Sequence, residues 1–262
     1  MTRIAVIGDV GGHPDQLRRA LDDLGARGDR LPADLTVIQV GDLVDRGPDS
    51  LGALDLVERL ARDPGWVQLT GNHEAQYLEG GTVFTREPLA DAGVRRLREW
   101  WATGLLRVAA AVRVGDEDFL VCHAGLTLRC WRELGEPSAA ADAAAALNAR
   151  PALIGREGDH GRDPASGPLW AESGAALHEP WMGYAGVVPF GQIHGHSTVV
   201  RFRDRTWHCE GRIRNRAQVD WESRHVRVRV GGRRFIGVDP GHGRTGAESW
   251  RPLVLADAIL LG

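Results

Sequence analysis

Lysine is absent from this chain of 262 residues: all 32 basic side chains other than histidine are arginines, against 35 acidic ones. The absence excludes chemistries that need an ε-amine, namely a P-loop lysine on a nucleotide phosphate, a kinase-type ATP lysine, and a Schiff base to a carbonyl substrate or to pyridoxal phosphate. Any reaction of this protein must therefore use carboxylates, imidazoles and guanidiniums.

Cysteine is scarce and the charges nearly cancel. Cys122, Cys130 and Cys209 are odd in number and lack a CxxC spacing, which argues against a disulfide framework and a thiolate zinc site. We expect Cys122, at the end of an apolar run, to be a buried packing residue.

The formal net charge of −3 gives no general attraction to nucleic acid or acidic membranes. The first apolar run, residues 4–7, is too short for a signal peptide or a membrane span, so we expect a cytoplasmic protein without a membrane partner.

The composition is that of an ordinary globular chain, 43% hydrophobic and 26% charged, with no internal repeat or flexible linker. A single domain over residues 1–262 is the simplest organisation. The first 80 residues alternate short apolar runs with helical patterns, which predicts strands at 3–7, 35–40 and 66–69 and helices at 14–24 and 50–61. This βαβαβ order predicts a parallel sheet whose functional loops leave the carboxyl ends of the strands.

The remaining chain predicts a mixture of elements: a helix ending near Trp101, strands at 107–114 and 119–122, an alanine-rich helix at 138–149 with Ser138 as its N-cap, and an irregular stretch at 155–190. Beyond Thr198, alternation predicts two arginine-bearing strand faces, followed by a hairpin that turns at Gly231-Gly232. The two faces carry Arg201, Arg203 and Arg205, and Arg212, Arg214 and Arg216. Residues 201–234 hold eleven arginines against four acidic residues, which fits either solvent-facing strands or a landing surface for a polyanion.

Five short motifs, each placed after an apolar run, carry the chemistry. They read IGDVGGH, VGDLVDRG, TGNHE, VCHAG and IHGHS, and they supply Asp9, Asp42, Asn72, His123 and His196. Carboxylate, carboxamide and imidazole ligands without thiolate suit Mn²⁺, Fe or Zn²⁺, and a carboxylate between two sites can bridge two ions. Each motif alone is an ordinary turn pattern, but five in order at strand ends predict a metal cluster.

The series GD, GDLVDRG, GNHE, CHAG and GHS resembles the calcineurin-like metallophosphoesterases, and most closely the phosphoprotein phosphatase branch with its bacterial diadenosine tetraphosphatase relatives. The resemblance runs from about Ile4 to Ser197, and the segments 167–170 and 236–239 are also similar to family segments. It implies an α/β fold, specifically a four-layer α/β/β/α sandwich with two mixed sheets.

The resemblance also implies roles for individual residues. Asp42 would bridge two divalent ions, most often Mn²⁺ with Fe, Zn²⁺ or Ni²⁺ as alternatives, and a hydroxide between the ions would attack phosphorus. The remaining assignments are Asp9 as a ligand of the first ion, Asn72, His123 and His196 as ligands of the second, His73 as the general acid, Asp45 as its orienting carboxylate, and Arg46 as the residue that grips phosphate oxygens.

One position departs from the family pattern GDxHG: Gly11 stands where the family has a metal-binding histidine. We hypothesise that His13 swings back to the first ion. Alternatively His13 is an exposed residue at the start of a helix, and either His194 supplies the missing nitrogen or the first site lacks a ligand.

Three functions remain open from the sequence. The first is hydrolysis of phosphate monoesters, including phosphoprotein, and the second is cleavage of dinucleoside polyphosphates such as diadenosine tetraphosphate. The third is metal-dependent binding by a catalytically weakened protein. The expected partners are therefore phosphorylated small molecules, nucleotides or phosphoproteins. We do not expect a nuclease, because His196-Ser197-Thr198 lacks the second histidine of the GHxH pattern found in nuclease branches of the superfamily.

Overall fold

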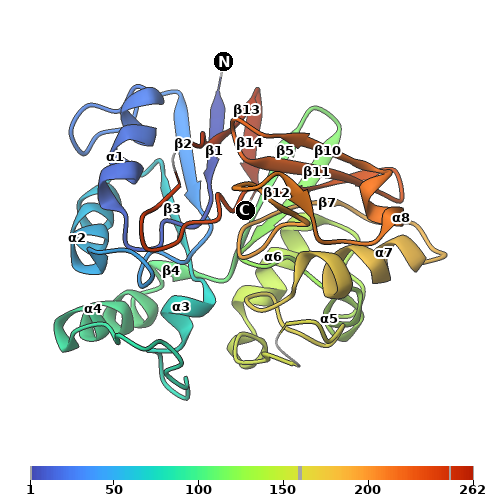
Figure 1. The fold of residues 1–262 in the computed structure, drawn as a ribbon, viewed down its shortest axis with the longest axis horizontal. Coiled ribbons are helices and arrows are strands. Elements are labelled where there is room, and N and C mark those ends of the chain that lie inside the picture. Colours follow the sequence, from blue (N-terminus) through green and yellow to red (C-terminus); the bar gives the residue numbers. More distant parts are fainter. Residues whose placement is uncertain (1, 159–160, 248, 262) are drawn as a thin grey trace.

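The computed structural model describes residues 2–158, 161–247 and 249–261, and two large mixed sheets dominate this part of the chain (Figure 1). The first sheet has the strand order β13-β1-β2-β3-β4. Its strands are β1 (Arg3–Ile7), β2 (Leu35–Gln39), β3 (Trp66–Leu69), β4 (Leu106–Arg107) and β13 (Leu253–Ala256). Strands β1 to β4 are parallel to their neighbours, as the βαβαβ pattern predicts, and β13 is antiparallel to β1.

The second sheet has the order β10-β11-β12-β7-β6-β5-β14. Its strands are β5 (Ala109–Val114), β6 (Glu117–Cys122), β7 (Gly191–His194), β10 (Ala217–Asp220), β11 (His225–Val230), β12 (Arg233–Gly237) and β14 (Ala258–Leu261). Only the central strands β6, β7 and β12 run parallel. The predicted hairpin is confirmed as β11 and β12, turning at Gly231-Gly232.

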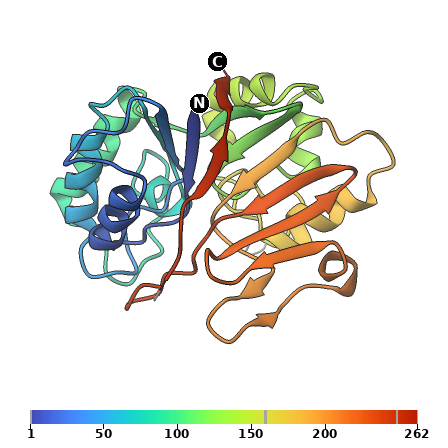
Figure 2. The same cartoon turned by 90° about the horizontal axis from the view of Figure 1, so that it is seen from above.

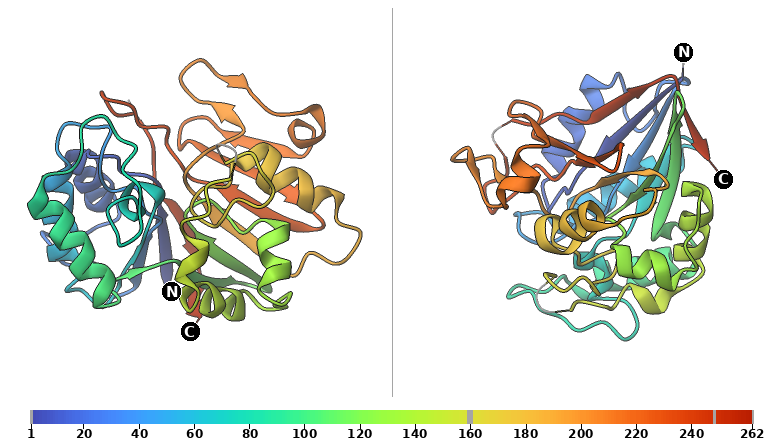
Figure 3. Two further views of the ribbon diagram at one scale, coloured as in Figure 1. Left: turned by 90° about the horizontal axis from the view of Figure 1, so that it is seen from below. Right: turned by 90° about the vertical axis from the view of Figure 1, so that its right-hand side faces the viewer.

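Helices cover the outer face of each sheet (Figure 2). On the first sheet these are α1 (Pro14–Asp23), α2 (Ser50–Leu60) and α4 (Asp91–Ala102). On the second they are α5 (Leu128–Glu133), α6 (Ala140–Asn148), the π-helix η2 (Ser173–His178) and α7 (Glu179–Gly183). Three shorter helices are α3 (Asn72–Ala75), η1 (Pro151–Leu153) and α8 (Gly211–Arg214). Two-residue strands β8 (Val200–Arg201) and β9 (Thr206–Trp207) form a separate hairpin near α8 (Figure 3).

Strand alternation builds the four layers. In β1, Ala5 and Ile7 pack under the helices, whereas Ile4 and Val6 point into a core shared by the two sheets. On the other side of that core the second sheet contributes Phe119. Because both faces of each central strand are covered, the strands read as unbroken apolar runs. The expected four-layer α/β/β/α sandwich with two mixed sheets is confirmed.

The end of the chain ties the sheets together. Strand β13 pairs with β1 and strand β14 pairs with β5, with only Asp257 between them (Figure 2). Leu253 and Ala258 enter the core between the sheets, so this short segment closes one edge of both.

Several predicted elements need correction. The predicted strand at 107–114 is two strands in different sheets, because the chain crosses between sheets at Val108. The alanine-rich helix begins at Ala140 behind Ala139, not behind a Ser138 cap, since burial of its alanines fixes the start. The stretch 155–190 contains η2 and α7, because Glu172 caps η2 and Trp181 is buried.

The prediction of two arginine-bearing strand faces is also wrong. Arg203 and Arg205 lie in the turn between β8 and β9, where Asp204 accepts hydrogen bonds from Arg201 and Thr206. Arg212 and Arg214 lie in α8. The alternating arginines predicted strands wrongly, because exposed side chains at every second position also occur in a turn or a short helix. In the described part of the chain, none of the helices combines the length and the apolar character that crossing a bilayer requires.

Candidate metal centre

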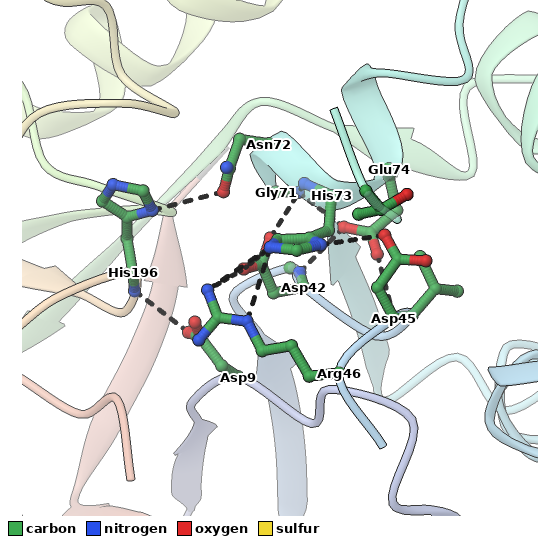
Figure 4. Close-up of polar contacts among 12 residues, drawn as sticks. Asp9, Asp42, Asp45, Arg46, Gly71, Asn72, His73, Glu74 and His196 are labelled. Carbon is green, nitrogen blue, oxygen red and sulfur yellow. Dashed lines mark hydrogen bonds and ion pairs between the residues drawn. The ribbon is translucent and has the colours of Figure 1, made fainter. Parts of the chain in front are cut away.

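The five motif residues meet where the two sheets come together. Asp9 follows β1, Asp42 follows β2 and Asn72 begins α3 directly after β3, so three neighbouring parallel strands of the first sheet each contribute one residue (Figure 4). His123 follows β6 and His196 follows β7, which are neighbours in the second sheet. The carboxyl ends of parallel strands from both sheets thus surround one small volume.

Four candidate ligand atoms converge in that volume. The carbonyl of Val40 lies 3.0 Å from His123 Nδ1, so Nδ1 donates and the neutral ring leaves a lone pair on Nε2. That Nε2 lies 3.0 Å from Asn72 Oδ1 and 3.2 Å from Asp42 Oδ1, and His196 Nδ1 lies 3.2 Å from the same Asn72 oxygen. Ligand atoms of Asp42, His123 and His196 all lie within 4.8 Å of one another. With the His196 proton on Nε2, a cation would bind these four atoms together, and the ligand set fits the ion expected from the sequence.

Two more carboxylate oxygens point to a second ion. Asp9 Oδ2 and Asp42 Oδ2 are buried, and neither has a hydrogen-bond partner among the described residues. Burial, and then the charges of Asp239 and Asp42, raise the pKa of Asp9 well above its usual value. Buried like charges that accept no hydrogen bond at these oxygens are costly, and a divalent cation between them would offset that cost.

Two glycines of the motifs are required because candidate ligand oxygens lie very close to their backbone. A Cβ on Gly71 would lie 2.2 Å from Asp42 Oδ1, and one on Gly195 would lie 2.2 Å from Asp9 Oδ1. Any larger residue at either position would displace a candidate ligand.

The loop after β2 is held in a strained form. Asp42, Asp45 and Arg46 have φ values of 54°, 66° and 60°, in the left-handed region that such residues adopt rarely. Buried Glu74 holds the loop, because its carboxylate accepts hydrogen bonds from the backbone N–H of Asp42 at 2.7 Å, Leu43 at 2.8 Å and Gly71 at 2.8 Å. Burial, with the charge of Asp42, raises the pKa of Glu74 to about 7.

Beside the candidate metal ligands lies a chain of polar contacts through His73 (Figure 4). His73 Nδ1 is 2.8 Å from Asp45 Oδ2, and its Nε2 is 3.3 Å from Arg46 Nη2. Asp45 also accepts hydrogen bonds from Gln76 at 2.7 Å and from Tyr77 at 3.1 Å. Arg46 Nη2 lies 3.7 Å from Asp42 Oδ2. The three residues assigned to catalysis from the sequence therefore form one connected group next to the candidate ligands.

The histidines proposed to fill the gap at Gly11 lie elsewhere. His13 is buried, not exposed, and its Nε2 donates to the carbonyl of Gly243 at 2.9 Å. His194 donates from Nδ1 to the carbonyl of Gly195 at 3.1 Å, and its ring lies 5.8 Å from that of His178 in η2. The structure thus brings Asp9, Asp42, Asn72, His123 and His196 together and leaves His13 and His194 in other contacts.

Sequence reasoning missed two buried carboxylates of this centre, Glu74 and Asp239. Glu74 belongs to the GNHE motif, but the motif alone does not predict that its carboxylate binds the backbone of the loop after β2. Asp239 follows β12, and only pairing of β12 with β7 brings it to the site. Cys122 is buried as expected, and burial raises the pKa of its thiol to about 12.

Fold and site together define an α/β/β/α protein with a candidate metal-binding cluster at the meeting strand ends. A family model described as calcineurin-like phosphoesterase matches residues 2–166, and the chain belongs to this family.

Two relatives show the range of similar proteins. Serine/threonine-protein phosphatase 2 of Escherichia coli is 40% identical over 76 residues, covering 29% of this chain and 31% of that protein. A symmetrical bis(5'-nucleosyl)-tetraphosphatase of Dechloromonas aromatica is 40% identical over 129 residues, covering 46% of this chain and 42% of that protein. The chain thus spans less than half the length of either relative.

Among solved structures, the cold-active protein-tyrosine phosphatase of a psychrophilic Shewanella species is similar with a TM-score of 0.57 at 15% identity, covering 100% of this chain and 81% of that one. At this identity the likeness shows the fold alone.

Proposed function

We propose that the protein is a metal-dependent phosphoesterase that hydrolyses phosphate monoesters. The observation that carries the proposal is the convergence of four candidate ligand atoms, from Asp42, Asn72, His123 and His196, beside a connected His73 and Arg46. A cluster that only stored an ion would not need an arginine and a carboxylate-paired imidazole at its edge. Membership of the phosphoesterase family supports the same activity.

We propose Mn²⁺ as the ion. Two such ions would activate a water molecule and offset negative charge on the phosphate. The chain's own residues do the rest. Arg46 binds phosphate oxygens, since a guanidinium can bind two oxygens at once. His73 donates a proton from Nε2 to the leaving oxygen, while Asp45 holds its Nδ1–H and so fixes the ring.

The protonation state of His73 fits this role. Burial by itself lowers the pKa of the imidazole, but the charge of Asp42 and the hydrogen bond with Asp45 outweigh burial and raise that pKa above its usual value. A larger share of the rings therefore carries the proton near neutral pH, as a general acid requires.

A second candidate is dinucleoside polyphosphate hydrolysis. A cavity of about 710 Å³ adjoins the centre at Asp239 and Ser197 and carries Arg162, Arg201 and Arg203 on its wall. Another, of about 480 Å³, contains Arg46 and His73. Hollows on two sides of the centre would accept the two ends of an extended anionic substrate. The printed names of the relatives cover both phosphatase and tetraphosphatase.

Turnover assays with three substrates test the proposal: a chromogenic monoester, a phosphopeptide and diadenosine tetraphosphate, each with Mn²⁺. We expect turnover of the monoester, and a loss of roughly 10²–10⁴-fold in kcat for His73→Ala at unchanged metal content. His208→Ala, which changes an exposed imidazole, is the matched control in the monoester assay alone, because His208 lines the cavity of about 710 Å³ that the second candidate function would use.

Preference for diadenosine tetraphosphate over the monoester would favour the second candidate. No turnover with Mn²⁺, Fe²⁺, Ni²⁺ or Zn²⁺ despite bound ion would favour a binding protein instead.

A further inference from the structure

The leaving group of the substrate lies beside His73. Its position rests on the proposed function, in which His73 Nε2 protonates the leaving oxygen. A general acid comes within about 2.6–3.2 Å of the oxygen that it protonates. The carbon atoms bonded to that oxygen therefore lie close to the imidazole, and the side chains around His73 form the surroundings of the leaving group.

An aromatic ring packs against the imidazole of His73. The ring centroid of Phe84 lies 5.1 Å from that of His73, and the two planes are inclined by 75°, which is an edge-to-face contact. The polar partners of the imidazole lie at its nitrogens, with Asp45 at Nδ1 and Arg46 at Nε2. Phe84 thus supplies an apolar surface next to a ring whose nitrogens face polar groups.

This apolar surface is open to solvent and extends beyond Phe84. Phe84 is 45% exposed, and its ring contacts that of Trp170 edge-to-face with the centroids 5.5 Å apart. Trp170 is itself fixed, because its Nε1 donates to the carbonyl of Ile154 at 2.9 Å. A third ring that covered Phe84 would gain free energy, since burial of apolar area and contacts between rings are both favourable.

The backbone that carries Phe84 is tied to the residues that hold His73. Gln76 Oε1 accepts hydrogen bonds from the backbone N–H of Phe84 at 3.0 Å and of Thr85 at 3.3 Å. The Nε2 of Gln76 donates to Asp45 Oδ2 at 2.7 Å, and the same oxygen of Asp45 holds His73 Nδ1. One amide side chain therefore fixes Phe84 relative to His73, and a preorganised surface loses little free energy when a ligand binds to it.

The cavity beside Phe84 lacks the positive charge that a phosphate chain needs. Phe84 lines this cavity of about 430 Å³ together with Trp170 and Trp101, and no arginine or histidine among the described residues lines it. The other two cavities near the centre differ, because the one of about 710 Å³ carries arginines and the one of about 480 Å³ contains Arg46. The cavity beside Phe84 is therefore suited to an uncharged aromatic group.

We propose that Phe84 is a specificity-determining residue for the leaving group, and that the preferred substrates are phosphate monoesters of alcohols or phenols that carry an aromatic ring. The ring of the leaving group packs on Phe84 and Trp170, while Arg46 binds the phosphate. An ester of a small aliphatic alcohol leaves this aromatic surface uncovered and gains nothing from it.

Benzyl phosphate and ethyl phosphate test the proposal, because both release a primary alcohol of similar basicity and they differ in the aromatic ring. We would measure kcat/KM for both esters with Mn²⁺. The wild type should prefer benzyl phosphate by about tenfold, which corresponds to about 1.4 kcal/mol. Phe84→Ala should remove most of this preference, so that the ratio of the two kcat/KM values approaches one. Phe84→Tyr keeps the ring and should keep the ratio, and Phe84→Leu, which keeps an apolar side chain without a ring, should lower it as Phe84→Ala does.

Val83→Ala is the matched control, since Val83 is an exposed apolar neighbour of Phe84 and lines neither of the two cavities beside His73. It should leave the ratio unchanged. Equal kcat/KM for both esters in the wild type, or an unchanged ratio in Phe84→Ala, would overturn this inference and leave the proposed function intact. An equal fall of the ratio in Val83→Ala and Phe84→Ala would also overturn it. Absence of turnover of both esters by the wild type with bound Mn²⁺ would overturn the proposed function as well.

Discussion

The two halves of the metal centre differ in how they are built. The half around Asn72 combines an amide oxygen, a carboxylate oxygen and two imidazole nitrogens, and three pairs of these atoms lie 3.0–3.2 Å apart. The half around Asp9 contains carboxylates, and Asp239 on its edge also lines the cavity of about 710 Å³. One half is thus a compact nitrogen-containing site, whereas the other is an oxygen site beside solvent. We expect the ion at Asn72 to be held tightly and the ion at Asp9 to exchange.

Asp42 belongs to both halves, so replacing it should have the largest effect. Asp42→Asn weakens the shared carboxylate without changing its shape, and we expect loss of both ions and of turnover. Metal content after gel filtration and the monoester assay would measure this. Asp204→Asn, an exposed carboxylate, is the control. Retention of either ion at wild-type affinity would contradict a shared ligand.

The next variants separate the halves. His123→Ala should remove the ion at Asn72, and Asp9→Ala should remove the ion at Asp9, each leaving one ion bound. Turnover should fall in both because the phosphate needs both positive charges. Calorimetric stoichiometry distinguishes them, and a variant that loses both ions at once would show that the halves bind as one unit.

Glu74 acts on both halves without touching either ion. Glu74→Gln replaces one acceptor oxygen by an amide, so one end of the loop that carries Asp42 loses a backbone partner. We expect affinity to fall by roughly 10–100-fold for both ions, the usual cost of losing an outer partner. If only one ion weakened, the loop would be holding Asp42 for one half alone. Glu79→Gln, an exposed neighbour, should change neither affinity.

The smallest expected effect is the loss of folding stability in acid. Measuring it in metal-free protein distinguishes unfolding from release of the ions at low pH. His178 is buried next to His194, and burial lowers the pKa of His178 to about 3. The unfolded chain binds a proton near pH 6.5, whereas the folded chain does not until about pH 3. The free energy of unfolding therefore falls as the pH drops below 6.5, by up to about 1.4 kcal/mol per pH unit from this residue.

His178→Leu should flatten that decline in metal-free protein, as measured by urea unfolding at pH 7, 6 and 5. His208→Leu, at an exposed position, should leave the slope unchanged. If the free energy of unfolding fell equally with pH in His178→Leu and in the wild type, groups other than His178 would cause the acid sensitivity. Ion release at low pH could then be measured without allowing for protonation of His178.

Much of the fold was readable because it depends on local patterns. The βαβαβ order, the β11–β12 hairpin and the positions of Asp9, Asp42 and Asn72 after their strands follow from apolar runs that end in glycine-flanked turns. The crossing at Val108 was not readable, because a continuous apolar run looks the same whether its residues join one sheet or two. The arginine segments failed for a related reason: alternation of exposed residues does not distinguish a strand from a turn or a short helix.

The sequence by itself determined which chemical groups are available: carboxylates, imidazoles and arginines in motifs whose glycines permit close approach, with no lysine and no imidazole at position 11. The tertiary structure alone decided which of them meet. Glu74 and Asp239 lie far from Asp9 along the chain, and pairing of β12 with β7 and folding of the loop after β2 bring them into one buried volume. Local sequence patterns cannot show this, because a contact between distant residues depends on the packing of whole sheets.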